Sequence, residues 1–149
     1  MHVAIVLGSK SDLAFAGKIS DVLKEFGVES ETTVASAHKV PEKVVTLIEK
    51  LNARTDATVV IAVVGMSNGL GGVLAGSCVH PVIACPPFAD LADYQVNVHS
   101  SLQMPSDVPV MTVLNPKNAA LSALRILGEG DADVRKKLMK RIEKIKGDY

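Results

Sequence analysis

Three short polar segments, each directly after an apolar stretch, carry the side chains that could do chemistry. They are Gly8-Ser9-Lys10-Ser11-Asp12, Ser36-Ala37-His38-Lys39 and Gly65-Met66-Ser67-Asn68. Backbone N–H groups that open a helix have no partner within it and attract phosphate, and a lysine nearby can hold an anion. A histidine can transfer a proton near neutral pH. The segments therefore point to a small anionic ligand and to proton transfer on it.

Strand and helix patterns alternate along the chain and would position these segments. We predict strands over residues 3–7, 28–34, 58–64, 81–85 and 109–113, the second nearer an edge because charges weaken its alternation. Helices are predicted over residues 15–26, 41–51, 68–77, 98–103, 119–127 and 131–146, and residues 88–97 are predicted to form a loop. Gly27 is placed to end the first helix and Pro41 to begin the second.

This alternation predicts an α/β fold, a three-layer α/β/α sandwich with a doubly wound parallel sheet in a single domain over residues 1–149. In such sheets, ligands bind at the carboxyl ends of the strands, where the strand order reverses. All three polar segments follow strands and reach that edge. We therefore expect one crevice to gather these residues: Ser9, Ser11, Asp12, Ser36, His38, Lys39, Gly65, Ser67 and Asn68.

The composition restricts the classes of function. Basic and acidic residues number 16 each, and a net charge of zero favours neither nucleic acid nor a membrane as partner. The longest apolar run, residues 57–66, is shorter than the roughly 20 residues that span a bilayer. The first strand begins so close to Met1 that it leaves no room for a signal peptide. We therefore expect a soluble, cytoplasmic protein.

Neither the cysteines nor the histidines suggest a metal site. Cys78 and Cys85 match no zinc or redox spacing, which favours two reduced thiols. No pair of histidines has the spacing of a local metal clip. We predict no bound metal.

Each polar segment also has a plainer interpretation. Ser11 or Asp12 could serve only as the N-cap of the following helix, and the first segment lacks P-loop spacing. A lone histidine is more often structural, but His38 follows a strand and lies beside Lys39, which favours a function. The glycines after Gly65 do not form a dinucleotide fingerprint, because they do not follow the first strand. They favour a close approach of a ligand to the backbone.

Six strings in order, GSKSD, SAHKVP, GMSNGLGG, VIACPP, SLQMP and NPKNAAL, resemble the aminoimidazole ribonucleotide (AIR) carboxylase family of purine synthesis. The likeness covers residues 3 to about 127. The resemblance implies a flavodoxin-like fold, a homo-octamer with active sites near subunit interfaces, and no metal or organic cofactor.

The family has two branches, and the resemblance favours one of them. One branch is a mutase that moves a carboxylate from the exocyclic nitrogen to ring carbon 4. The other fixes carbon dioxide directly onto AIR. The mutase pattern has arginine after the histidine of SAH and a second histidine in a later loop, where this chain has Lys39 and Gly69. The strings here are similar to the carbon-dioxide branch, although many of its members have arginine at the position of Met66.

Carried over position by position, the resemblance implies a role for each candidate residue. Ser11, Ser36 and Lys39 would bind the 5-phosphate of the ribose. Asp12 would accept hydrogen bonds from ribose hydroxyls, and Ser9 would line the same pocket. His38 would transfer the proton. The carboxylate or carbon dioxide would be surrounded by Gly65, Ser67 and Asn68.

The expected function is therefore carboxylation of AIR by carbon dioxide, in a purine-biosynthetic enzyme of the carboxy-lyase type. Three alternatives stay open. The first is the mutase reaction, and the second is a non-catalytic sensor of nucleotide monophosphates. The third is an oligomer-forming partner of other purine enzymes, for which the last predicted helix, residues 131–146, offers one apolar stripe.

Overall fold

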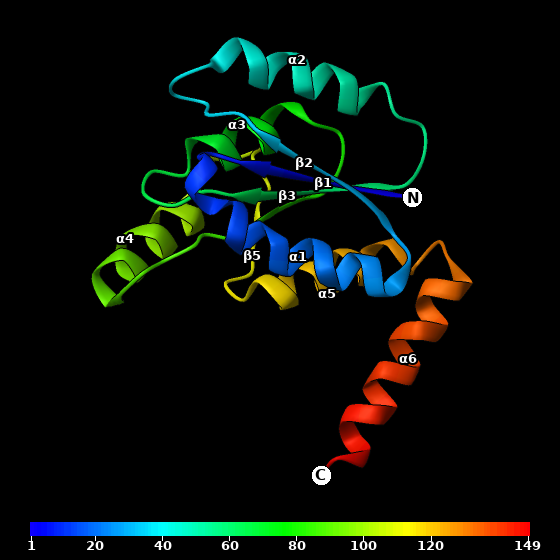
Figure 1. The fold of residues 1–149 in the computed structure, drawn as a ribbon. Helices are drawn as coiled ribbons and strands as arrows, with labels where there is room; N and C mark the ends of the chain where they lie inside the picture. Colours follow the sequence, from blue (N-terminus) through cyan, green and yellow to red (C-terminus); the bar gives the residue numbers. More distant parts are fainter.

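A computed structural model describes residues 1–149 and shows a five-stranded parallel sheet between two layers of helices (Figure 1). The strands are β1 (His2–Leu7), β2 (Glu29–Val34), β3 (Thr58–Val63), β4 (Val82–Ala84) and β5 (Met111–Thr112). Their order in the sheet is β2-β1-β3-β4-β5, which is the flavodoxin-like order. This confirms the predicted fold class.

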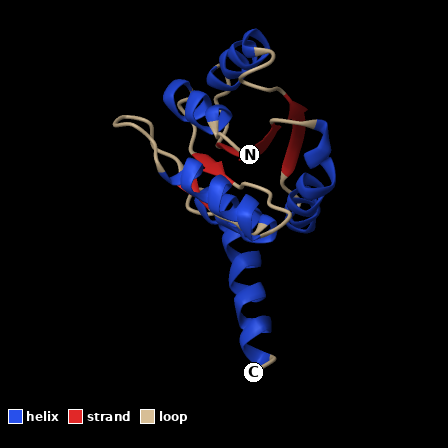
Figure 2. Ribbon diagram, turned by 90° about the vertical axis from the view of Figure 1, so that its left-hand side faces the viewer, coloured by secondary structure: helices blue, strands red, loops and turns tan.

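Two helices pack on each face of the sheet, and the last helix extends away from it. They are η1 (Lys10–Asp12), α1 (Leu13–Phe26), α2 (Pro41–Asn52), α3 (Gly69–Ser77), α4 (Leu91–Leu102), α5 (Pro116–Leu127) and α6 (Ala132–Gly147). The helices α1 and α5 pack on one face, and α2 and α3 lie on the other (Figure 1). The helix α6 leaves the body of the molecule and extends away from it (Figure 2).

The core explains why β1 and β3 are central. All six residues of each strand are buried, so their apolar runs pack against helices on both faces. Val3, Ile5 and Leu7 belong to the core beneath α1 and α5, and Ala4 and Val6 to the core beneath α2 and α3. The charged strand β2 lies at an edge, as predicted.

Most predicted boundaries agree with the structure. Gly27 ends α1 with a left-handed backbone, φ 72°, and Pro41 opens α2. The helix α5 begins at Pro116, three residues before the predicted start, because Asn115 caps it by accepting hydrogen bonds from the next backbone N–H groups. The strand β5 is shorter than predicted.

The prediction for residues 88–97 was wrong. Helix α4 occupies Leu91–Leu102, and Asp90 caps its start by accepting a hydrogen bond from the Asp93 N–H. The predicted helix over residues 98–103 is only its last part. The two buried residues of α4 are Asn97 and Ser101, which are both polar. A helix that buries polar side chains shows no apolar periodicity in its sequence.

No helix is long and apolar enough to cross a membrane. Neither cysteine forms a disulfide. Cys85 is fully buried, and this burial raises the pKa of its thiol to about 12. Burial also raises the pKa of the partly buried Cys78.

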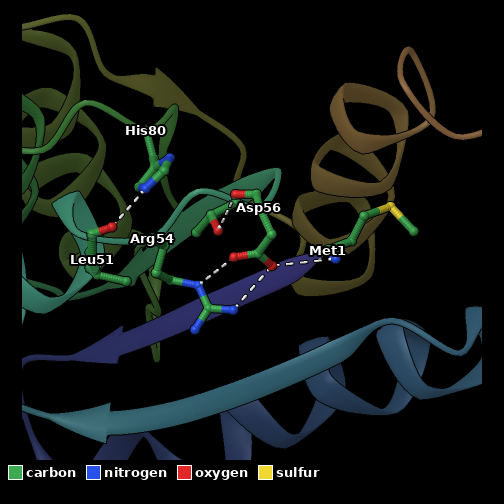
Figure 3. Close-up of polar contacts among 6 residues, drawn as sticks. Met1, Leu51, Arg54, Asp56 and His80 are labelled. Atoms are coloured by element: carbon green, nitrogen blue, oxygen red, sulfur yellow. Dashed lines mark hydrogen bonds and ion pairs between the residues drawn. The ribbon is translucent and has the colours of Figure 1, made fainter.

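An ion-pair cluster joins the start of β1 to the turn before β3 (Figure 3). The Asp56 carboxylate lies 3.0 Å from Arg54 Nε and 3.3 Å from the amino group of Met1. Hydrogen bonding from Arg54, and then from Met1, lowers the pKa of Asp56 to about 2. Because the folded pKa lies below the unfolded one, the stabilisation is complete above the unfolded pKa of about 4 and is lost as the pH falls through about 2.

We expect Asp56→Asn to lower the free energy of unfolding at pH 7 and to lower it much less at pH 2, where most of the stabilisation has been lost. Urea unfolding at pH 7, 4 and 2 measures this difference. Asp21→Asn is the matched control, since Asp21 is an exposed carboxylate that makes no ion pair. An equal loss of stability for Asp56→Asn at all three pH values would contradict the assignment.

Candidate active site

A cleft of 920 Å³ lies at the carboxyl ends of the central strands. Eight of the nine predicted site residues line it: Ser9, Ser11, Asp12, Ser36, His38, Lys39, Gly65 and Ser67. They come from the segments after β1, β2 and β3, so the topology brings together residues almost 60 positions apart (Ser9 and Ser67). Asn68 is the exception, because its side chain is buried outside the cleft lining.

The segment after β1 forms a small hydroxyl and carboxylate network. Ser9 caps η1, since its Oγ accepts from the N–H of Ser11 at 3.2 Å and from its hydroxyl at 2.8 Å. Asp12 occupies the N-cap position of α1 but makes no side-chain capping bond there. The cap is therefore Ser9 rather than Ser11 or Asp12. The Asp12 carboxylate is left to accept bonds from a ligand.

Partial burial in the cleft raises the pKa of Asp12, and a hydrogen bond from the Ser11 hydroxyl at 3.3 Å opposes that shift. Burial has the larger effect, so the pKa of Asp12 lies above its ordinary value. Ligand hydroxyls that donate to this carboxylate would favour its charged form and counteract the burial. The position thus suits a ligand that brings hydrogen-bond donors.

The segment after β2 places His38 over the start of α3. Its Nε2 lies 2.8 Å from the point that a Cβ atom on Gly69 would occupy. The imidazole is exposed and lines the cleft, as does its neighbour Lys39. The Lys39 N–H donates to Ser36 Oγ at 3.3 Å, which fixes the turn. An imidazole and an ammonium group therefore share one wall of the cleft.

The segment after β3 is a strained turn. Met66 has φ 58°, a left-handed conformation that costs a residue with a side chain about 1–2 kcal/mol. Its side chain is 77% exposed and lines the cleft. Its backbone N–H donates to Oδ1 of Asn97, whose Nδ2 donates to the carbonyl of Pro87 at 2.7 Å. Helix α4 therefore holds this turn in place through the side chain of Asn97.

Asn68 has a structural task in this arrangement. Its Oδ1 accepts from the N–H of Gly71 at 2.9 Å and so caps α3, and its Nδ2 donates to Ser101 Oγ at 3.1 Å. These bonds use the side-chain amide groups that were expected to face the carboxylate.

Several cleft residues were missed from the sequence: Phe15, Lys18, Phe88, Asp93 and Asn97. Phe88 packs edge-on against Tyr94, with ring centroids 5.3 Å apart. Phe88, Asp93 and Asn97 lie in or just before α4, in the stretch predicted to be a loop. Recognising the Asp90 cap could have revealed this helix.

A smaller cavity of 420 Å³ lies between β1, β2 and α2, and none of the predicted site residues line it. No group of three or more His, Cys, Asp or Glu side chains is arranged to hold a metal ion. The larger cleft is thus the candidate active site.

A model of the AIR carboxylase family matches residues 2–147. The chain belongs to the AIR carboxylase family. This confirms the resemblance found in the six strings and identifies the protein as an enzyme of a purine-biosynthetic family.

Named relatives in this family carry two different activities. The chain is 44% identical to the N5-carboxyaminoimidazole ribonucleotide mutase of Methanocaldococcus jannaschii, over 97% of this chain and 90% of the relative. It is 39% identical to the phosphoribosylaminoimidazole carboxylase of Archaeoglobus fulgidus, over 99% of this chain and 83% of the relative. Overall identity therefore does not separate the two reactions.

The fold agreement extends over the whole AIR carboxylase domain. The crystal structure of Treponema denticola PurE superposes with a TM-score of 0.93 at 36% identity, covering 99% of this chain and 92% of that one. The chain spans only 29% to 32% of the length of the multifunctional or bifunctional animal relatives that it matches.

Proposed function

We propose that this enzyme carboxylates AIR with carbon dioxide at ring carbon 4, with His38 as the proton-transfer group. The ribose 5-phosphate would bind to Ser11, Ser36 and Lys39, and the ribose hydroxyls to Asp12. The cleft geometry supports this division, because the hydroxyl-rich wall after β1 and the cationic wall after β2 converge on one cavity.

The observation that carries the choice of branch is the close approach of His38 to Gly69. The mutase pattern has a histidine at position 69, but here the imidazole of His38 stands 2.8 Å from where any Cβ there would lie. A second imidazole at that position has no room while His38 keeps its place. Lys39, in the position of the mutase arginine, supports the same branch.

The chemistry fits the residue types along the cleft. The aminoimidazole ring is an enamine, so its carbon 4 can form a bond to the carbon of carbon dioxide. One C–O double bond opens to give the carboxylate, and carbon 4 becomes tetrahedral. His38 then removes the hydrogen from carbon 4 as a proton, and the C–H electron pair returns to the ring to restore aromaticity. A well-placed base contributes about 10²–10⁴-fold to such a step.

Two further effects would assist the reaction. Binding of the phosphate, which lies away from the reacting carbon, supplies orientation. Holding both reactants in one cleft removes the entropy cost of their encounter. Gly65 and Ser67 line the same cleft as His38, and the carboxyl group would form beside them.

Incubation of the purified protein with AIR and bicarbonate, without ATP, tests the proposal. We expect the 4-carboxy product to form, because the base and the anion-binding groups lie in one cleft. Product formed only from the N-carboxy substrate would instead establish the mutase reaction. If calorimetry detects binding of AIR but neither AIR nor the N-carboxy substrate is turned over, the non-catalytic sensor of nucleotide monophosphates is favoured.

We also propose self-association into the octamer that the resemblance implies. Its support is the exposed apolar surface of the extended helix α6, where Met139, Ile142 and Ile145 are 57%, 38% and 50% exposed. Such residues favour a contact with another copy over a solvated helix.

A further inference from the structure

Helix α4 is attached to the body through polar contacts. Its buried residues are Asn97 and Ser101, whereas Leu91, Val96 and Leu102 are each at least 60% exposed. A helix without an apolar inner face depends on hydrogen bonds to keep its position. Most of those bonds go to the turn from Gly65 to Asn68.

Two serines of α4 hold the end of that turn. Ser100 Oγ accepts from the backbone N–H of Asn68 at 2.7 Å, and Ser101 Oγ accepts from its side-chain Nδ2 at 3.1 Å. The Ser101 hydroxyl donates in turn to the carbonyl of Asn97 at 2.8 Å. These contacts fix the start of α3 relative to α4.

Asn97 holds the centre of the turn and joins two loops. Its Oδ1 accepts from the N–H of Met66, and its Nδ2 donates to the carbonyl of Pro87 at 2.7 Å. Nδ2 also lies 2.9 Å from where a Cβ on Gly65 would be, so the amide packs directly against the turn. The loop after β3 and the loop after β4 therefore share one side chain.

The backbone of Met66 needs this support. Its φ of 58° is unfavourable for a residue with a side chain, and its own side chain is mostly in solvent. Because the methionine side chain is not buried, its packing does not stabilise this backbone conformation. The hydrogen bond to Asn97, which is only 5% exposed, does so from the inside.

We infer that Asn97 is a positioning residue that sets the backbone of the Gly65–Ser67 turn around the reacting carboxyl group. The inference rests on the proposed function for the identity of that group. Asn97 acts through Met66, and it makes no hydrogen bond to the residues proposed to bind the phosphate. The expected signature is a lower kcat with little change in the affinity for AIR.

Three variants test this role. Asn97→Leu removes both hydrogen bonds at similar volume, and we expect kcat to fall at least about tenfold, since misplaced groups lose rate steeply. Asn97→Asp keeps the acceptor for the Met66 N–H and should retain more of kcat. Adding Met66→Gly to Asn97→Leu should restore part of kcat, because glycine adopts positive φ without strain.

Asn52 provides a matched control away from the cleft. Its Oδ1 accepts from the N–H of Val79 and its Nδ2 donates to the carbonyl of Ser77, both at 2.9 Å. Asn52→Leu therefore removes a pair of side-chain to backbone bonds of the same kind at an exposed position, and kcat should stay unchanged. Thermal unfolding of all variants separates loss of fold from loss of rate.

Hydrogen exchange at the Met66 amide provides a readout that does not depend on activity. It should be slow in the wild type and fast in Asn97→Leu. If the wild type turns over only the N-carboxy substrate, the proposed function fails, and the same kcat comparison is made with that substrate. An unchanged kcat and slow exchange in a folded Asn97→Leu variant would overturn the positioning role.

Discussion

We expect His38→Asn to lower kcat at least about 10²-fold while leaving the affinity for AIR almost unchanged. Asparagine keeps a polar side chain of similar reach but cannot take up a proton, so a general base's contribution of about 10² or more is lost. The phosphate and ribose contacts proposed for the other residues are left in place. Steady-state kinetics give kcat, and calorimetry with AIR gives the dissociation constant.

The control for this variant is His99→Asn, since His99 is exposed on α4 and does not line the cleft. It should keep wild-type kinetics. Weak binding of AIR by His38→Asn with turnover preserved would show that His38 binds the substrate and does not transfer its proton.

The sequence was sufficient for the sheet and for the place of the cleft. Unbroken apolar runs such as residues 59–63 pack well between two helical layers, so they predict central parallel strands. Chain geometry then brings the polar segments that follow these strands to one edge. That argument needs no side-chain detail, which is why eight of the nine candidate residues line one cavity.

The sequence was insufficient to assign roles to polar side chains that form hydrogen bonds to the backbone. Asn68 and Asn97 are both buried asparagines whose side-chain amides bond to main-chain atoms, at the start of α3 and in the loops after β3 and β4. From the sequence, an asparagine that caps a helix cannot be distinguished from one that faces a ligand. Helix α4 was missed for the same reason, since its inner face satisfies hydrogen bonds and buries no apolar residue.

The proposed choice between carboxylase and mutase depends on the packing of His38 against Gly69, which the sequence alone does not show. Identity to a named mutase and to a named carboxylase is similar. Position 69 needs glycine because the imidazole of His38 occupies the space that any side chain there would fill. A single methyl group is therefore a sensitive probe of the proposed site.

We expect Gly69→Ala to lower kcat about 10²-fold without loss of the fold, because a shift of about 1 Å in a reacting group can cost that much. The new Cβ would lie 2.8 Å from Nε2 of His38 and 3.1 Å from its Cε1, so the imidazole must move. The imidazole is exposed and can rotate away at little cost in stability. The backbone of Gly69 does not have positive φ, so alanine can adopt this backbone conformation without strain. Kinetics with AIR and bicarbonate, together with thermal unfolding, measure both effects.

Gly72→Ala is the matched control on the same helix. Its Cβ would meet only Met104 Sδ at 3.6 Å, an ordinary contact, and the helix should gain about 0.5–1 kcal/mol with kcat unchanged. A double variant then distinguishes displacement of His38 from any other effect. If Gly69→Ala acts by moving the imidazole, adding it to His38→Asn should cost little more, because the two changes remove the same contribution. Additive losses would mean that position 69 affects the reaction independently of His38.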